Sequence, residues 1–289
     1  MYVHGNNLEQ KENHKTKYRD EESKQFLSEI RKEYNKWKAS NEELVGPGRD
    51  ESENDSDIIS QRVKLLNTYK DFLDQQHYAE KFDSRSNLHS SVLEEFMFFL
   101  FKDIVASFSE HALIGKSHTF KDIFFRSSNY QHMIETPNAL IEIKDHDFAI
   151  GTKISANMNC RGSEVVENHI WDIPAVAVEC KTYLDKTMLQ DASTAAEQLK
   201  HRNPNAMYIV VAEWLKLTES VNLRKFKIDQ IYVLRKQKNT DREFRYDAKY
   251  VKNPIYSDVV EHLFRNVRTF LTTDWEGGIA FGLNQGYLV

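Results

Sequence analysis

Hydrophobic residues near the start of the chain recur every three or four positions, the spacing that places them on one face of a helix. Two such runs span residues 26–37 and 58–73, and they include Leu27, Ile30, Tyr34, Val63 and Leu66. Each run predicts an amphipathic helix with one buried stripe. A third run, 92–105, is apolar on most of its circumference and predicts a helix in the centre of the core.

Further along the chain, the pattern changes to short, nearly continuous apolar segments, which are typical of buried strands. These segments are 118–126, 141–151, 175–181, 206–213 and 228–235. Helical spacing returns at 186–202 and at 257–271. Helices before, among and after a set of strands predict an α/β fold, in which a mixed central sheet is flanked by helices on both faces.

The chain is expected to divide into an N-terminal helical region with an acidic linker, residues 1–80, and an α/β domain, residues 81–289. The first twenty residues are polar, and we expect them to be disordered. Residues 45–57 join the first two helices and contain Gly46, Pro47 and Gly48 followed by acidic residues. Since this linker has almost nothing to bury, we expect it to be mobile.

Composition places the 289-residue chain among soluble globular proteins, with 40% hydrophobic and 29% charged residues. No apolar run reaches 18 residues, and the N-terminus has no apolar stretch that resembles a signal peptide. We therefore expect a cytoplasmic protein with no membrane partner. The two cysteines, Cys160 and Cys180, are too few for a disulfide framework or a zinc knuckle.

Charge is distributed unevenly along the chain, although the formal net charge is only −5. Residues 41–57 carry seven acidic residues and one arginine, whereas residues 222–252 carry ten basic and four acidic residues. A basic segment with aromatic residues suggests contact with phosphates. A solvent-exposed face of ordinary composition explains the same segment, and both interpretations stay open.

The strongest candidate for chemistry is the segment Ala175–Lys181, in which four apolar residues lead to Glu179 and Lys181. Side chains alternate along a strand, so these two lie on one face about 7 Å apart, while Cys180 points the other way. The neighbouring strand carries Asp147. Two carboxylates are the ligands that Mg²⁺ prefers, the backbone carbonyl of Cys180 offers a third, and a lysine beside them stabilises charge on a phosphoryl group.

Other interpretations of these residues stay open. Glu179 and Lys181 form an ordinary ion pair in the plainest one, and Asp145 competes with Asp147 as a ligand because it shares the same face of its strand. Gly115-Lys116-Ser117 resembles the end of a phosphate-binding loop, but the earlier glycine that such a loop requires is absent.

Two segments, K-D-H-D-F-A-I-G at 144–151 and V-E-C-K-T-Y-L-D-K-T-M-L at 178–189, resemble the PD-(D/E)xK nuclease superfamily. More closely, they resemble the subunits of the heterodimeric BbvCI/Bpu-type Type II restriction endonucleases. With the helix and strand that follow, the resemblance covers about residues 88–233. This chain departs from the motif in having no proline before Asp147.

The resemblance implies a restriction-endonuclease-like core with an N-terminal helical extension, and Mg²⁺-dependent cleavage of double-stranded DNA that leaves a 5′-phosphate. It makes Asp147 and Glu179 metal ligands and Lys181 the catalytic lysine. It also favours Glu94 or Glu95 as a helix glutamate near the metal, although both glutamates are equally suited to a solvent-facing role. Gln198 would be an accessory polar group.

The resemblance further implies that the partner is a homologous, non-identical nuclease subunit, so that each chain of a heterodimer cuts one strand of an asymmetric site; a homodimer in isolation is also open. Base recognition requires side chains that reach base edges. We expect such side chains in the segment between the catalytic strands, where Lys153, Asn157, Asn159 and Arg161 lie, and in the segment of Arg126 and Asn129. A plain polar loop is the alternative to the first segment.

Two functional alternatives remain. A structure-specific repair or recombination nuclease uses the same carboxylates and lysine. A catalytically silent DNA-binding module keeps the fold and uses these charged residues structurally.

Overall fold

A computed structural model describes residues 2–82, 87–238 and 251–275 and four further positions, 279, 282, 283 and 286. The elements along the chain are α1 (Val3–Glu12), α2 (Glu21–Glu43), α3 (Asp55–Leu73), α4 (Gln76–Lys81), α5 (Ser90–Phe108), β1 (Leu113–Phe125), α6 (Tyr130–Glu135), β2 (Ala139–Met158), β3 (Glu167–Leu184), α7 (Lys186–Arg202), β4 (Met207–Leu215), the 3₁₀ turn η2 (Leu223–Lys225), β5 (Gln230–Val233) and α8 (Ser257–Thr272). Residues 239–250, which belong to the basic segment of the sequence, lie outside the described residues.

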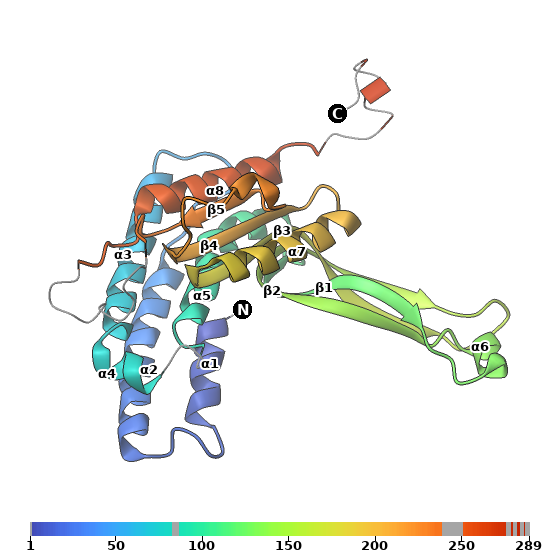
Figure 1. Cartoon of the computed structure of the whole chain (residues 1–289), viewed down its shortest axis with the longest axis horizontal. Helices are drawn as coiled ribbons and strands as arrows, with labels where there is room; N and C mark the ends of the chain where they lie inside the picture. Colours follow the sequence, from blue (N-terminus) through green and yellow to red (C-terminus); the bar gives the residue numbers. More distant parts are fainter. Residues whose placement is uncertain are drawn as a thin grey trace.

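The five strands form one mixed sheet in the order β1-β2-β3-β4-β5. β1, β2 and β3 are antiparallel neighbours, whereas β3, β4 and β5 are parallel. Helices α5 and α8 cover one face of the sheet, where Phe101 stacks on Phe264, and α7 covers the other face (Figure 1). The predicted mixed sheet between two helical layers is confirmed.

Alternation along the strands divides the core between these two layers. On β3, Val176, Val178 and Cys180 pack in the same cluster as α5, whereas Ala177 packs with α7. Nearly every side chain of α5 between Val92 and Val105 is buried, as its almost uniform apolar composition predicts. This helix also supports the N-terminal helices, which belong to the same hydrophobic cluster as the sheet.

The first residues of the chain form a helix, contrary to the predicted disorder. Helix α1 lies against α5, and the buried Glu95 carboxylate accepts hydrogen bonds from the backbone amides of His4 and Gly5, at 2.8 and 3.1 Å. The His4 ring lies between the hydroxyl groups of Ser91 and Tyr69, at 2.9 and 2.6 Å. Free amides at the start of a helix favour a carboxylate, so Glu95 fixes α1 to the body of the molecule.

The connection between α2 and α3 is anchored, although its composition predicts a mobile linker. The buried guanidinium group of Arg62 donates hydrogen bonds to the carbonyl oxygens of Asn41, Leu44 and Gly46. The amide of Gly46 donates to Asp103 on α5, at 2.6 Å. The connection buries little surface of its own and depends on these polar contacts.

Residues 118–145 and 152–172 form a long projection that we call the arm (Figure 1). The first part of β2 pairs with β1, and the last part of β2 pairs with β3. The two parts overlap at residues 149–151, and the β2–β3 pairing has a register shift between Ile150 and Gly151. A Cβ added at Gly151 would lie only 2.2 Å from the carbonyl oxygen of Ile173. Only glycine permits this close backbone approach, so β2 can serve both pairings.

A buried ion network joins the N-terminal helices to the sheet. Glu213 on β4 forms ion pairs with Lys70 of α3, at 2.6 Å, and with Arg235, at 3.0 Å, and all three side chains are fully buried. The guanidinium group of Arg235 also lies over the ring of Trp214. Of the helices that the structure describes, none has the length and apolar character needed to cross a membrane.

Candidate active site

Asp147, Glu179 and Lys181 converge where β2 and β3 run side by side. The pair that precedes this point is Phe148 and Val178, so the register places Asp147 beside Glu179. The Lys181 ammonium nitrogen lies 3.2 Å from Asp147 Oδ2 and 3.0 Å from Glu179 Oε1. The expected arrangement of a carboxylate pair with a lysine between them is therefore present in the structure.

The Cys180 side chain points away from Glu179 and Lys181, as strand alternation predicts. Its side chain is buried in the cluster shared with α5, and this burial raises the pKa of the thiol well above its usual value. Its backbone amide donates a hydrogen bond to Asp147 Oδ2, at 2.9 Å. The thiol is therefore protonated and removed from the site, and only the backbone of Cys180 takes part in the arrangement.

The electrostatics of the site reflect like charges held close together. Burial, followed by the neighbouring Asp147, raises the pKa of Glu179. Burial alone would lower the pKa of Lys181, but Asp147 and Glu179 outweigh it and raise this pKa above its usual range. Lys181 is thus a firmly held cation that offsets part of the negative charge of the two carboxylates.

The two candidate glutamates of α5 have different surroundings. Glu94 lines the cleft beside Asp147 and Lys181, and burial, followed by the charge of Asp147, raises its pKa to about 7. Glu95 faces the opposite way, where it accepts hydrogen bonds from α1 and from the Tyr34 hydroxyl, at 2.9 Å. Of the two, only Glu94 is placed to act near a metal, and Glu95 holds α1 and α2.

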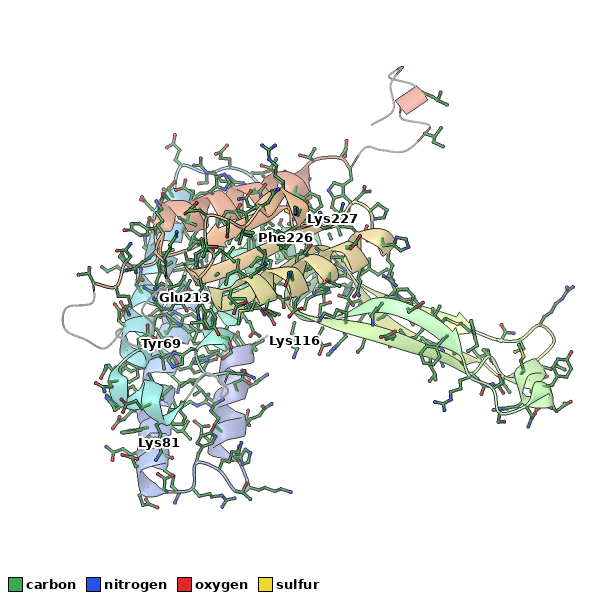
Figure 2. The ribbon with its side chains drawn as sticks, viewed as in Figure 1. Tyr69, Lys81, Lys116, Glu213, Phe226 and Lys227 are labelled. Atoms are coloured by element: carbon green, nitrogen blue, oxygen red, sulfur yellow. The ribbon has the colours of Figure 1, made fainter. Side chains whose placement is uncertain are left out.

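Asp147, Lys181 and Glu94 line a cleft of about 480 Å³ between α1, the start of α5 and strands β1 to β3, whereas Glu179 is not among its lining residues. Val3 and Asn7 of α1 form one wall together with Asn87. Lys116 of β1 also lines the cleft, and Figure 2 shows it where the arm joins the body. Its positive charge opposes the rise in the pKa of Glu94. The sequence around Lys116 lacks the glycine that a phosphate-binding loop requires, and nothing else in the sequence indicated that Lys116 lies at this site.

Tyr208 is a second residue that the sequence did not reveal. Its hydroxyl lies 3.4 Å from Glu179 Oε2, and its ring contacts that of His146 edge to face. Tyr208 lies in the apolar first part of β4, so nothing in the sequence pattern indicates that its hydroxyl contacts Glu179. It holds the carboxylate of Glu179 from the side away from Lys181.

Gln198 is not brought into the cleft. It lines a separate cavity of only about 10 Å³ beneath α7, together with His146 and Arg202. A hydrogen bond joins its backbone carbonyl to the Arg202 guanidinium group. The resemblance predicted an accessory polar group on this helix, and the structure does not provide one at this position.

The six predicted DNA contacts all lie on the arm, and none of them lines the cleft. The expected recognition loop is in fact the end of β2, a short turn and the start of β3. Three of the side chains hold the arm together: Lys153 pairs with Asp172, Asn129 caps α6, and Asn159 donates to carbonyl groups within the turn. Arg126, Asn157 and Arg161 are exposed.

The basic segment, residues 222–252, likewise contains some residues that are buried or ion-paired and others that line a groove. Arg235 is buried, and Lys236 and Lys238 pair with Asp258 and Glu219. Lys225, however, lines a groove of about 580 Å³ together with Lys186 and Lys216. The Lys216 ammonium lies 5.8 Å from the ring of Tyr183, which itself lines the cleft. A lysine-lined groove, with no acidic residue among its described lining residues, therefore lies close to Tyr183 of the cleft.

The donor set at the cleft suits a hard divalent cation. Asp147, Glu179 and Glu94 offer carboxylate oxygens, and Mg²⁺ is usually held by one or two carboxylates while it keeps several waters. Within the described ranges, no three His, Cys, Asp or Glu side chains already form a metal-binding group. Protein groups and water would therefore have to share the coordination, as Mg²⁺ commonly requires.

Comparisons with known proteins identify a similar fold and a family. The native BbvCI A2B2 tetramer contains a chain with 20% sequence identity and a TM-score of 0.71, and the match covers 96% of this chain and 99% of that chain. A restriction endonuclease PspGI–substrate DNA complex matches with 13% identity and a TM-score of 0.30, over 84% of this chain and 91% of the other. The search of curated proteins gave no match. The model of the Bpu10I restriction endonuclease family matches residues 85–288, about seven-tenths of the sequence, and the chain therefore belongs to this family.

Proposed function

We propose that the chain is a Mg²⁺-dependent Type II restriction endonuclease subunit that hydrolyses one strand of double-stranded DNA at a short, asymmetric site. The observation that carries this proposal is the contact of Lys181 with both Asp147 and Glu179 in a chain of a restriction endonuclease family. When bound at these carboxylates, Mg²⁺ would supply Lewis-acid activation of the phosphate and of water. Asp147 and Glu179 would hold it, with Glu94 and the backbone carbonyl of Cys180 as further ligands.

The residues of the chain have complementary roles in this proposal. The raised pKa of Lys181 keeps its side chain protonated at neutral pH, so it donates hydrogen bonds and opposes negative charge that develops on the phosphoryl oxygens. The amide of Cys180 and the hydroxyl of Tyr208 fix the orientations of Asp147 and Glu179. A preorganised site of this kind reduces the reorganisation required during the reaction.

Double-stranded DNA is the proposed substrate because a groove lined by Lys186, Lys216 and Lys225 lies near Tyr183, which lines the cleft. A row of lysines without acidic neighbours favours a phosphate backbone, and each contact adds a salt-dependent contribution to affinity. Lys116 adds a further positive charge at the other side of the cleft. The six predicted contacts on the arm remain predictions, and three of them, Arg126, Asn157 and Arg161, have exposed side chains.

The proposed partner is a homologous nuclease subunit, because one set of carboxylates cuts one strand. The BbvCI relative, described as an A2B2 tetramer, supports an assembly of more than one subunit. In the proposed heterodimer, each subunit would place one such site at one of the two DNA strands. A cytoplasmic location is proposed with it, since the substrate is cellular or invading DNA.

The test is incubation of the purified protein with circular plasmid and Mg²⁺, alone and with a candidate partner subunit. Discrete fragments or a nicked circle support a restriction enzyme, a smear indicates a repair nuclease, and intact DNA under all conditions indicates a catalytically silent module. Glu179→Gln and Lys181→Met should each reduce cleavage by about 1,000-fold or more and leave DNA affinity nearly unchanged.

Matched controls are Glu21→Gln and Lys24→Met, which disrupt an exposed Glu–Lys pair on α2 of similar N–O distance, 2.7 Å. These variants should cut at the wild-type rate. Normal cleavage by Lys181→Met would show that the assigned site is not the catalytic one.

A further inference from the structure

The outer face of α1 carries amide side chains. Asn6 and Asn7 lie four and three positions before Gln10, so the three share one face of the helix, opposite the buried His4 and Leu8. Among the residues that the structure describes, none forms a hydrogen bond with these three amide groups. An amide group presents a donor beside an acceptor, so the face is free to pair with a ligand that offers the complementary pattern.

Helix α2, which packs beside α1, has an outer face of a different kind. Its charged side chains pair along the helix, with Lys24 at 2.7 Å from Glu21 and Lys36 at 2.6 Å from Glu33. Glutamate and lysine favour a helix, and their pairs stabilise it further, whereas asparagine disfavours a helix. The asparagines of α1 therefore do not contribute to helix stability, and another role accounts for them better.

The contacts of α1 with the body of the molecule fix the direction of this face. A Cβ added at Gly5 would lie only 2.3 Å from the Tyr34 hydroxyl oxygen, so α1 packs closely on α2. The Arg31 guanidinium group donates to the Gly5 carbonyl oxygen at 3.2 Å and pairs with Glu12 at 2.8 Å. Glu95 holds the start of the helix. A preorganised face loses little conformational entropy when a ligand binds.

The amide face begins at the catalytic residues. Asn7, together with Val3 one turn before it, lines the same cleft as Asp147 and Lys181. From there α1 runs beside α2, whereas the arm leaves the sheet in another direction (Figure 1). A duplex whose scissile phosphate contacts Lys181 would therefore meet the first two turns of α1. From Asn6 to Gln10 a helix rises about 6 Å, or about two base pairs.

We propose that α1 reads bases beside the cut, with Asn6, Asn7 and Gln10 directed at adenines in the major groove. Asparagine and glutamine form paired hydrogen bonds with N6 and N7 of adenine, a pattern that distinguishes an A·T pair from the others. The exposed Glu9 borders this face, and its carboxylate suits the amino group of cytosine but not a phosphate. This inference rests on the proposed function, and it adds α1 to the contacts predicted on the arm.

The experiment is a binding selection from DNA duplexes with a randomised central segment. Every protein in it is full-length and carries Glu179→Gln, so that Mg²⁺ can be present while cleavage is slow. The reference protein should retain duplexes with A·T pairs at fixed positions. Asn7→Ala, and separately Asn6→Ala combined with Gln10→Ala, should each relax the preference for adenine at one or two neighbouring positions by about 5-fold to 150-fold, the discrimination of one bidentate pair.

Gln61→Ala is the matched control, because Gln61 is an exposed amide on another helix, α3. It should leave the selected sequence unchanged. Alanine is a better helix former than asparagine or glutamine, so the α1 variants should fold, and thermal unfolding checks this.

Relaxed preference at neighbouring A·T positions in the α1 variants, with Gln61→Ala unchanged, supports the proposal. An unchanged selected sequence overturns it. An equal loss of affinity for all sequences also overturns it, because that result indicates contact with the phosphate backbone. A reference protein that selects no sequence has the same consequence.

Plasmid cleavage is measured separately with proteins that retain Glu179. Sequence selection that depends on α1, in a protein that leaves plasmid intact alone and with a candidate partner subunit, would contradict the proposed function alone. Cleavage at one defined sequence that the α1 variants reproduce with undiminished selectivity would contradict this inference alone.

Discussion

At the scale of single residues, Glu94 is a group of the cleft whose ionisation depends strongly on its surroundings. Burial and the charge of Asp147 raise its pKa from 4.5 to about 7, although Lys116 opposes the rise. The folded protein therefore holds a proton on Glu94 at pH values at which the unfolded chain has released it. Folding stability should fall as pH rises through this interval, because the unfolded state binds fewer protons there.

Glu94→Gln removes this dependence. Without metal, the variant should match the wild type in melting temperature below about pH 4.5 and exceed it by a growing margin up to about pH 7. Thermal unfolding in the presence of a chelator measures the difference. Glu43→Gln, an exposed substitution, controls for the change of carboxyl to amide. A difference that does not vary with pH would contradict the assigned environment of Glu94.

Lys116→Ala tests whether the cleft receives a phosphate beside Glu94. The variant should bind a DNA duplex more weakly, and the slope of log K against log salt concentration should become shallower by about 0.9. Fluorescence anisotropy at several salt concentrations provides the measurement. Lys121→Ala is the control, since Lys121 lies on the same strand but pairs with Glu142. Equal slopes for the two variants would remove Lys116 from the DNA interface.

Strand alternation was sufficient to predict that Glu179 and Lys181 share a face, and the neighbouring strand supplied Asp147. It was insufficient for the glutamates of α5, because a helix that is apolar on nearly all sides gives no signal for which way Glu94 or Glu95 points. Tyr208 on β4 and Lys116 on β1 lie at the site because their strands pair with β3 and β2. Such pairings are tertiary, and one sequence does not specify them.

At the scale of elements, Gly151 determines the path of β2. Gly151→Ala would place a Cβ 2.2 Å from the carbonyl of Ile173, so the backbone of β2 or β3 must move. We expect a loss of about 1–3 kcal/mol in the free energy of unfolding, as for other overpacked sites. Urea denaturation measures it. Gly48→Ala, where no atom lies within 4 Å of the added carbon, should change stability by no more than about 0.5 kcal/mol.

Hydrophobic periodicity predicted most of the elements, including segments 118–126 and 141–151, but not the outer parts of β2 and β3. The segment between the catalytic strands is polar and was interpreted as a loop, although it continues both strands outward. Strands of an exposed arm bury few side chains, so they lack the apolar pattern on which the prediction depends. The polar helix α1 was missed for the same reason, since its stability derives from Glu95 and His4 contacts with distant residues.

At the scale of the whole molecule, Lys70, Glu213 and Arg235 connect the N-terminal helices, the sheet and the segment that leads to α8. Lys70→Met would leave the buried Glu213 with one cationic partner instead of two. The expected cost is about 3 kcal/mol of folding free energy, the lower end of the range for breaking a buried pair. Chemical denaturation measures it, and Lys64→Met, an exposed change on the same helix, should have little effect. An unchanged free energy of unfolding for Lys70→Met would mean that Arg235 alone compensates the charge of Glu213.

The sequence suggested a division at residue 80, whereas the N-terminal helices and the sheet share one hydrophobic cluster. Composition locates helices but does not show against which element each helix packs. The contacts that unite the molecule, such as those of Arg62 and Lys70, are made by residues that resemble ordinary surface charges in the sequence.

The position of α1 has a practical consequence for anyone who produces this protein. Val3 and Asn7 line the cleft, so a purification tag joined ahead of α1 would begin beside the space through which substrate must pass. Such an extension would lower measured turnover without altering a single catalytic group. Affinity handles are better inserted at exposed turns distant from this entrance, such as residues 15–17 between α1 and α2.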